Sequence, residues 1–478
     1  YKRQGKDPNE KKIDKPKITP IVMNRDSSSL FLKEIQASKV APIEPVFLDY
    51  SKDLQKLTAQ SNIPVLYKEN TSNDLFSLMG TNNDKAMGTA FEYMKYLGTS
   101  KMSLKEINEE FYKLACYFNV FPGSDRTYVM LEGLKENMPK AMALFEEILA
   151  DAQVNKEAYG NLAGDILKKR TDAKLNQGQN FNKLIQYAIW GPKSPATNVL
   201  TTAELQQMDP QELVDRIHKI NSFDHKILYY GPEKPQAVLD IIKQYHNVPE
   251  QLQPVPAAIE FSQQETPENR VLLAQYDAKQ IYFSAVSNRG EKFDPAIQPT
   301  LNMYNEYFGG GMNGIVFQEL RESRGLAYSA FADYSTTKRK EHQTNYAYTY
   351  IISQNDKMMD CIRVFNNILD TMPQSQAAFE LAQQAAVKRI ASQRITKANI
   401  IFSYLGNKRI GINYDLRRDI YAAMPKLTLE DIVKFEHDNM ANKPWLYIIL
   451  GDENNLDMKS LEKIAPVKRV ATEEIFTF

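Results

Sequence analysis

The residues best suited to metal chemistry in this chain are five histidines, and their spacing argues against a metal site. They are His218, His225, His246, His342 and His437. A helix presents two imidazoles to one zinc ion when they lie four residues apart, and no two of these histidines have that separation. A single histidine in an amphipathic helical pattern, such as His218 or His437, is more often structural or solvated. We therefore expect no metal to be bound by this chain.

Nucleophilic and phosphate-binding chemistry also lack their usual signatures. Cys116 and Cys361 both fall in segments that we predict as helix, and spacing suggests no general base for either thiol. No Gly-x-Ser-x-Gly elbow is present. The run GGGMNG at 309–314 lacks the Lys-Ser/Thr ending of a phosphate loop, so nucleotide binding is not expected.

The segment YFGGGMNGIVFQELRESRGLAYSAFADYS, residues 307–335, is the strongest candidate for a binding site. Its three consecutive glycines, Gly309, Gly310 and Gly311, allow unusual backbone dihedrals and the close approach of another backbone. A helical stretch follows and leads through a Gly-Leu-Ala-Tyr sequence into a strand. A helix, a tight turn and a strand in succession predict the edge of a pocket.

The bulk properties exclude several classes of protein. Lys+Arg and Asp+Glu number 59 each, which argues against a chain whose main task is to coat nucleic acid or an anionic membrane. No apolar run approaches the length of about 18 residues that a membrane span needs. At 478 residues, with 43% hydrophobic residues, the chain predicts a soluble protein of more than one domain.

Two composition shifts divide the chain. Residues 1–45 are rich in Lys and Pro and lack a sustained helical or strand period, so we predict a solvated linker or arm. Because no Met precedes Tyr1, we expect these residues to continue a segment removed upstream. A second boundary falls at NVPEQLQPVPAA, residues 247–258, where three prolines would end a helix. These shifts predict domains at 46–250 and 259–478.

The two predicted domains repeat one another, which reports structural duplication. ENMPKAMALFEEIL at 136–149 matches DKMMDCIRVFNNIL at 356–369, with apolar residues on one face of a helix in each copy. MDPQELVDRIHKI and LTLEDIVKFEHDN match in the same way, with Asp209 and Thr428 as N-cap candidates. Each is followed by an apolar run that ends at a glycine, KILYYG and WLYIILG. Strands are also predicted near Phe76 and Phe283. The fold class is therefore α+β, a tandem duplication of a mixed or antiparallel sheet covered by helices.

GGGMNGIVFQELRESRGLAYS resembles the signature of the C-terminal half of the pitrilysin/insulinase family of zinc metallopeptidases. That family also includes mitochondrial processing peptidase and the respiratory-chain core proteins. The resemblance covers nearly all of residues 46–470 and implies a pair of LuxS/metallohydrolase-like halves. In this family an Arg and a Tyr seven residues later bind the substrate backbone near the scissile carbonyl. The matching residues are Arg321 and Tyr328. The alternative is that Arg321 forms a surface ion pair and Tyr328 fills a core.

The same resemblance implies a degenerate zinc motif in the first domain. AMGTAFEYMKYLGT is similar to the family's A-H-x-x-E-H-M-x-x-x-G-T, with Thr89 and Tyr93 in place of the two histidines. Glu92 stands at the catalytic position, and Asp165 lies about where the third ligand would be. A hydroxyl and a phenol do not replace two imidazoles as zinc ligands. Glu92 and Asp165 are then surface or interface carboxylates.

These features predict the substrate-binding half of a zinc endopeptidase or oligopeptidase, which is inactive alone. The resemblance implies a partner that bears the HxxEH motif and holds the zinc, within the same precursor or on another subunit, and a peptide substrate. Two alternatives stay open: a non-catalytic scaffold or assembly subunit of the same fold, and a peptide-binding module without hydrolysis. Our working expectation for the compartment, which two cysteines do not decide, is the bacterial periplasm or cell envelope.

Overall fold

The computed structural model contains two six-stranded mixed sheets. It describes residues 19–21, 27–38, 41–73, 75–82, 85–122, 127–257, 259–337 and 343–477. The first sheet has the order β1-β2-β6-β3-β5-β4 and the second the order β12-β7-β11-β8-β10-β9. The strands of the first sheet are β1 (Gln55–Thr58), β2 (Pro64–Glu69), β3 (Leu75–Asn82), β4 (Cys116–Pro122), β5 (Thr127–Leu134) and β6 (Ile227–Gly231). Those of the second are β7 (Arg270–Gln275), β8 (Gln280–Ser287), β9 (Ala327–Ser335), β10 (Tyr346–Gln354), β11 (Leu446–Gly451) and β12 (Val467–Arg469).

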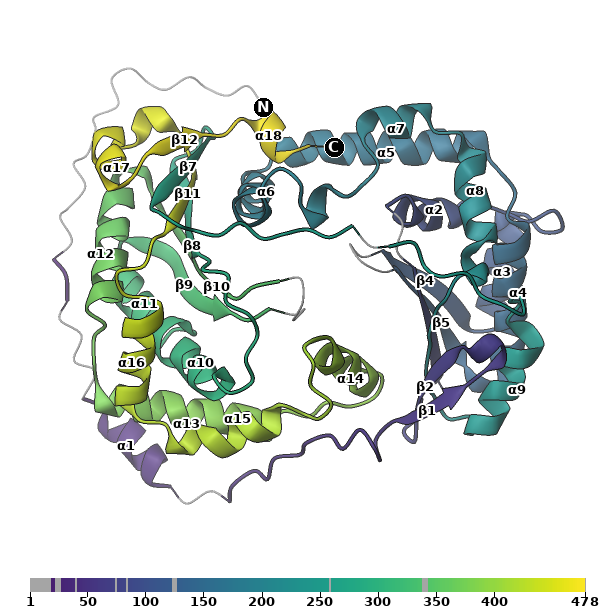
Figure 1. The fold of residues 1–478 in the computed structure, drawn as a ribbon, viewed down its shortest axis with the longest axis horizontal. Helices are drawn as coiled ribbons and strands as arrows, with labels where there is room; N and C mark the ends of the chain where they lie inside the picture. Colours follow the sequence, from purple (N-terminus) through teal and green to yellow (C-terminus); the bar gives the residue numbers. More distant parts are fainter. Residues whose placement is uncertain are drawn as a thin grey trace.

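Helices cover the outer faces of both sheets, and the inner faces look toward the centre of the molecule (Figure 1). The helices of the first half are α1 (Leu30–Ala37), α2 (Met87–Met94), α3 (Leu104–Lys113), α4 (Met138–Asp151), α5 (Lys156–Lys174), α6 (Gln177–Trp190), α7 (Thr202–Gln207), α8 (Pro210–His218) and α9 (Pro235–Tyr245). Those of the second half are α10 (Gln298–Tyr304), α11 (Ile315–Phe317), α12 (Met358–Asp370), α13 (Gln376–Ser392), α14 (Asn399–Arg409), α15 (Arg417–Ala423), α16 (Leu429–Asn439), α17 (Met458–Ile464) and α18 (Thr472–Ile475). No helix in the described ranges is long and apolar enough to cross a membrane.

The predicted α+β duplication is confirmed strand by strand. In sheet order, β2, β6, β3, β5 and β4 correspond to β7, β11, β8, β10 and β9. In each half a parallel pair, β2–β6 or β7–β11, continues into antiparallel strands. Only the outermost strand differs, because β1 precedes β2 and runs antiparallel to it, whereas β12 comes from the end of the chain and runs parallel to β7.

The repeated helices also occupy equivalent places. Helices α4 and α12 pack their repeated apolar residues, Phe145 and Phe365 among them, into the two main cores. Asp209 accepts a hydrogen bond from the first turn of α8, and Thr428 forms a reciprocal capping box with Asp431 at the start of α16. Side-chain oxygens at these positions satisfy amide groups that a helix leaves unpaired, as the spacing predicted.

One pair of equivalent helices is exchanged between the halves. Helix α6 belongs to the first half by sequence, but Phe181 and Leu184 are buried against β7, β8 and β11 of the second sheet. Helix α14 belongs to the second half, but Ile401 and Tyr404 pack on Leu66 and Leu228 of the first sheet. Each helix thus lies over the inner face of the other half's sheet (Figure 1). The boundaries 46–250 and 259–478 remain a prediction.

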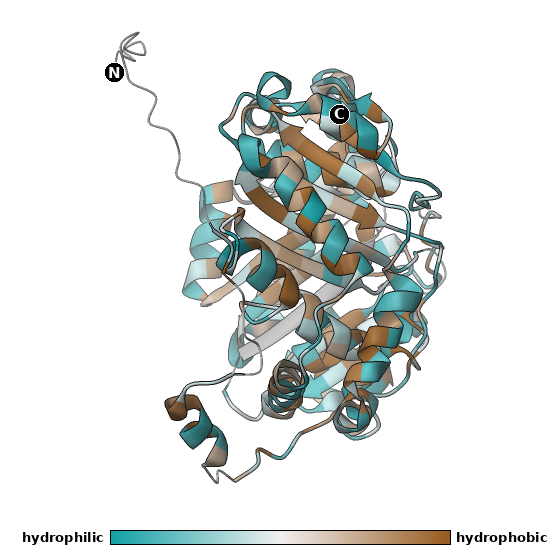
Figure 2. Cartoon of the chain, turned by 90° about the vertical axis from the view of Figure 1, so that its left-hand side faces the viewer, coloured by the Kyte–Doolittle hydropathy of each residue, from teal (hydrophilic) through white to brown (hydrophobic). Residues whose placement is uncertain are grey.

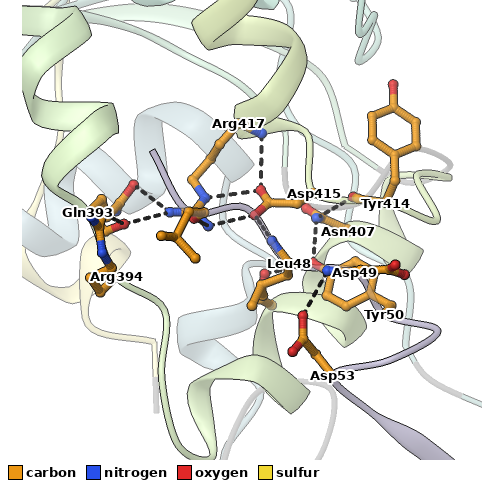
Figure 3. A network of polar contacts seen from close by, with 12 residues as sticks. Leu48, Asp49, Tyr50, Asp53, Gln393, Arg394, Asn407, Tyr414, Asp415 and Arg417 are labelled. Atoms are coloured by element: carbon orange, nitrogen blue, oxygen red, sulfur yellow. Dashed lines mark hydrogen bonds and ion pairs between the residues drawn. The ribbon is translucent and has the colours of Figure 1, made fainter. Parts of the chain in front are cut away.

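A polar network fastens the segment before β1 to the second half, and we call it the latch (Figure 3). Asp415 is buried, accepts a hydrogen bond from the Leu48 amide at 2.9 Å, and forms an ion pair with Arg417. Asn407 of α14 donates to the Tyr50 hydroxyl at 2.9 Å. The latch therefore joins residues on either side of the predicted domain boundary.

One local prediction is wrong, and one helix was not predicted. Cys116 opens strand β4 and is not helical, because α3 ends at Lys113 and Ala115 takes a left-handed φ of 48° that a helix cannot continue. Residues 1–45 contain the helix α1, which Ser29 caps through the Leu32 amide. The short apolar pattern of this helix was missed, because the Lys- and Pro-rich composition of the whole segment outweighs it. Helix α1 buries no residue and lies away from the main body (Figure 2).

Candidate functional site

Arg321 is carried by a short helix that is anchored on its inner side. Ile315, Val316 and Leu320 are fully buried and fix α11 and the π-helical turn η6 (Gln318–Glu322) against the core of the second half. Arg321 lies in this turn with its side chain 42% exposed. Single π-helical turns inside helices occur frequently at functional sites. The packing therefore holds the backbone of Arg321 while its guanidinium stays accessible.

A tight turn then brings Tyr328 back toward Arg321. Gly325 has a φ of +54°, a left-handed conformation that favours glycine. The amides of Gly325 and Leu326 donate to the carbonyls of Arg321 and Leu320, at 2.9 and 2.8 Å. Lys357 donates to the Gly325 carbonyl at 2.8 Å. These contacts end the helix and direct the chain into β9, where Tyr328 is the second residue.

Arg321 and Tyr328 lie together on the surface, and we call them the clamp pair. The guanidinium carbon of Arg321 is 5.8 Å from the centroid of the Tyr328 ring and 4.9 Å from that of Phe317. Tyr328 is 73% exposed, so it does not fill a core. Arg321 has a loose ion pair with Glu322 at 3.8 Å. A guanidinium and a phenol side by side can both donate hydrogen bonds to a peptide carbonyl.

The three glycines have different surroundings. A Cβ on Gly309 would lie 1.8 Å from the Ala332 carbonyl oxygen of β9, so the backbone of Gly309 packs directly on that strand. A Cβ on Gly310 would lie 2.9 Å from the Asn305 carbonyl oxygen. Gly311 has a φ of +65° and faces open space. Packing accounts for the first two glycines, and a substrate-binding role for the run remains a prediction.

Tyr93, at the place of the second zinc histidine, is part of the core. Its hydroxyl donates to the Asn155 carbonyl at 2.6 Å and accepts from the Asn155 amide at 2.8 Å. Its ring is fully buried and packs edge-on against Tyr159 at 5.7 Å. Burial raises the pKa of Tyr93, which keeps the phenol neutral. The phenol therefore joins α2 to the start of α5 and does not fit a zinc site.

The other residues of the degenerate motif do not form a metal-binding group. Thr89 is half-buried on α2, Glu92 forms an ion pair with Lys95 at 3.1 Å, and Asp165 is exposed on α5. Within the described part of the chain, no group of three or more His, Cys, Asp or Glu residues could hold a metal ion. This donor set does not fit zinc.

The described histidines make local contacts. His225 and His246 face each other with their Nε2 atoms 2.8 Å apart, and His246 Nδ1 contacts buried Glu146 at 2.6 Å. Burial lowers the pKa of His225. His218 contacts the Ala152 carbonyl at 3.1 Å, and the His437 side chain is 81% exposed. His342 lies outside the described residues. Sequence spacing could not reveal the contacts among Glu146, His225 and His246, because these residues come from three separate segments.

Two family models match the chain and together cover more than half of it. Residues 80–202 match the model described as insulinase (peptidase family M16), and residues 211–386 match the one described as the peptidase M16 inactive domain. The chain belongs to the M16 family. The first match includes the degenerate motif on α2, and the second includes the clamp pair.

One protein sequence and two solved structures are also similar to this chain. An uncharacterized zinc protease from Rickettsia felis is 22% identical over 295 residues, 58% of this chain and 66% of that protein. The structure of a peptidase M16 inactive domain from Pseudomonas fluorescens is 17% identical, has a TM-score of 0.64 and covers 84% of this chain and 98% of its own. The periplasmic protease PqqL from Escherichia coli is 12% identical, has a TM-score of 0.65 and is matched over 93% of this chain and 49% of its own. This chain therefore spans about two thirds of the Rickettsia protein and half of PqqL.

Proposed function

We propose that this chain is the substrate-binding C-terminal half of a zinc metalloendopeptidase or oligopeptidase. It clamps peptides for a half that bears the HxxEH motif and the zinc. The clamp pair is the observation that carries the proposal, because packing fixes its backbone while Tyr328 stays 73% exposed. By itself the chain is inactive, since Thr89 and Tyr93 offer no imidazole.

Strand β9 is the second feature that supports peptide binding. It is an edge strand of the second sheet, with no described strand on its outer side. Asn305 hydrogen-bonds the Tyr334 backbone and Gly309 packs on the Ala332 carbonyl, so the part of this edge open to a peptide is the part nearer Tyr328. An extended peptide can add to such an edge, where main-chain hydrogen bonds give affinity with modest sequence selectivity. Tyr328 lies at the start of this edge, which places the clamp pair beside the end of an added strand.

The clamp pair contributes most as charge develops on the scissile carbonyl. Donors aimed at a forming oxyanion stabilise it more than they stabilise the ground state, and loss of one donor typically costs about 100- to 1,000-fold in rate. We expect Arg321→Ala and Tyr328→Phe each to lower kcat/KM by about that factor. Because both side chains are exposed, the thermal midpoint should hardly change.

The test is peptide cleavage by this chain reconstituted with an HxxEH-bearing M16 half. Arg363→Ala and Tyr112→Phe are matched controls, because they change an exposed arginine and an exposed tyrosine elsewhere on the surface. Unchanged cleavage by both clamp variants would contradict the proposal. Zinc bound stoichiometrically by this chain alone would contradict the assignment of the metal to the partner.

The alternative is a non-catalytic scaffold of the same fold, and the description of the second family model as an inactive domain favours it. A scaffold predicts that the clamp variants leave both peptide binding and cleavage unaffected. For the compartment we propose the bacterial periplasm or cell envelope, on the similarity to the periplasmic PqqL. Fractionation of cells that express the full-length protein tests this.

A further inference from the structure

The inner face of the second sheet carries four aromatic rings beyond the part that α6 covers. They are Phe331 of β9 and Tyr346, Tyr348 and Tyr350 of β10, and we call them the aromatic wall. Phe331 stacks on Tyr350 at 5.5 Å and packs edge-on against Tyr348 at 5.9 Å, and Tyr346 lies 5.9 Å from Tyr348. Phe181 of α6 packs against Tyr350 with ring centroids 5.4 Å apart. All four rings are half-buried.

A carboxylate lies within the aromatic wall. Asp333 is directly opposite Tyr348 in the register of β9 and β10, just as Phe331 is opposite Tyr350. Directly opposed residues of an antiparallel pair share one face of the sheet. Asp333 therefore lies on the same face as the rings. Its charge contributes, after burial, to a Tyr348 pKa raised to about 12, and burial raises the pKa of Asp333 itself.

No cation in the described part of the chain neutralises this carboxylate. Among the residues that the structure describes, Asp333 has no hydrogen bond and no ion pair with a Lys, Arg or His. A partly desolvated carboxylate without a partner is unfavourable, so a cation that reached it would be bound favourably. Faces of aromatic rings also attract Lys and Arg side chains. Rings around one carboxylate are thus complementary to a positively charged group.

We propose that Asp333 and the aromatic wall form a subsite for a basic side chain of the bound peptide. The proposal rests on the proposed function, because it takes the ligand to be the peptide held by the clamp pair. Asp333 follows Tyr328 by five residues on β9, a distance of about 17 Å along an extended strand. The outer edge of β9 is closed at this point, because the Asn305 side chain binds the Tyr334 backbone and Gly309 packs on the Ala332 carbonyl. The peptide therefore reaches Asp333 across the inner face of the sheet. The basic residue then lies about five positions from the residue at the clamp.

The test uses two extended peptides of about 12 residues that differ at one position, arginine in one and neutral, nearly isosteric citrulline in the other. Binding to the full chain is measured by fluorescence anisotropy at low and moderate salt. We expect the arginine peptide to bind about 10- to 100-fold more tightly, the range for a hydrogen bond to a charged group. Asp333→Asn should reduce this ratio to about one while leaving citrulline binding unchanged. Asp360→Asn, which changes an exposed aspartate elsewhere, should keep the full ratio.

Tyr348→Leu is a second variant that keeps the carboxylate and removes one ring. It should lower the arginine preference without abolishing it. Equal binding of the two peptides by the unmodified chain overturns the subsite but leaves the proposed function standing. A preference that survives Asp333→Asn also overturns it. If neither peptide binds the chain, wherever in the peptide the arginine or citrulline is placed, the proposed function itself fails. The subsite then fails with it.

Discussion

Glu436 shows how a single residue can control stability without belonging to a binding site. It lies on α16 with 3% of its surface exposed, close to the buried hydroxyl of Tyr304. Burial, with a smaller contribution from the charge of Asp370, raises the pKa of Glu436 to about 8. The core of the second half therefore contains a carboxylic acid that is protonated at neutral pH.

We expect Glu436→Gln to remove a pH dependence of stability. In the unfolded chain a glutamate titrates near about 4.3, so between that pH and about 8 the folded state binds more protons than the unfolded state. The stability of the unmodified chain then falls as pH rises through this window. The variant should match it near pH 5 and exceed it at pH 9 by on the order of 4 kcal/mol.

Thermal unfolding at pH 5, 7 and 9 measures this difference. Glu430→Gln, on the exposed side of the same helix, is the control and should change the midpoint equally at each pH. If the thermal midpoints of Glu436→Gln and the unmodified chain change with pH in parallel, the buried carboxyl does not titrate as described.

Individual residues differed in how far they could be predicted. Arg321 and Tyr328 were predicted as a pair from the family resemblance and not from their spacing. The structure brings them together because one tight turn joins the helix of Arg321 to β9. Asp333 was missed, although tyrosines at every second position of β10 signal one face of a strand. Its partners come from the neighbouring strand, and the sequence of one strand alone does not determine the register between two strands.

At the scale of elements, Gly309 governs the contact between strand β9 and the π-helical turn that follows α10, Asn305–Gly309. Gly309→Ala puts a Cβ 1.8 Å from the Ala332 carbonyl, and a backbone atom cannot move aside as a side chain can. We expect a loss of about 3 kcal/mol or more, the upper range for overpacking. Gly164→Ala, in the middle of α5 with nothing within 4 Å, should instead gain roughly 0.5–1 kcal/mol. Urea denaturation midpoints separate the two, and equal midpoints would show that β9 can shift to make room.

Elements with a strong hydrophobic period were predictable from the sequence. Elements whose packing partners are distant in the sequence were not. The amphipathic helices α4, α12, α8 and α16 follow from apolar residues on one face. Helix α1 and strand β4 are short, and their ends depend on a serine cap and on one left-handed alanine. Helices α6 and α14 are equivalent in sequence position, but no local pattern says that each covers the sheet of the other half.

The latch is the feature of the whole molecule that is easiest to test. Asp415→Ala leaves the Arg417 side chain, 15% exposed, without its carboxylate and removes the acceptor of the Leu48 amide. Breaking a buried ion pair typically costs about 3–5 kcal/mol. Asp419→Ala breaks the neighbouring exposed pair with Arg418 and should cost under about 1 kcal/mol. Thermal midpoints compare the two, and similar shifts would show that the latch adds no stability.

The exchange of α6 and α14 also limits which motions this molecule can make. Since each half contributes a helix to the inner face of the other's sheet, turning one half against the other would pull Phe181 and Ile401 out of apolar cores. The connector, described at 247–257 and 259–269, has the prolines and exposure of a hinge, but the packing of these two helices opposes such a motion. A large rotation between the two halves would therefore expose the buried faces of both helices. Under the proposed function, a peptide would then reach Arg321 and Tyr328 through the contact with the HxxEH-bearing half and not through a rotation within this chain.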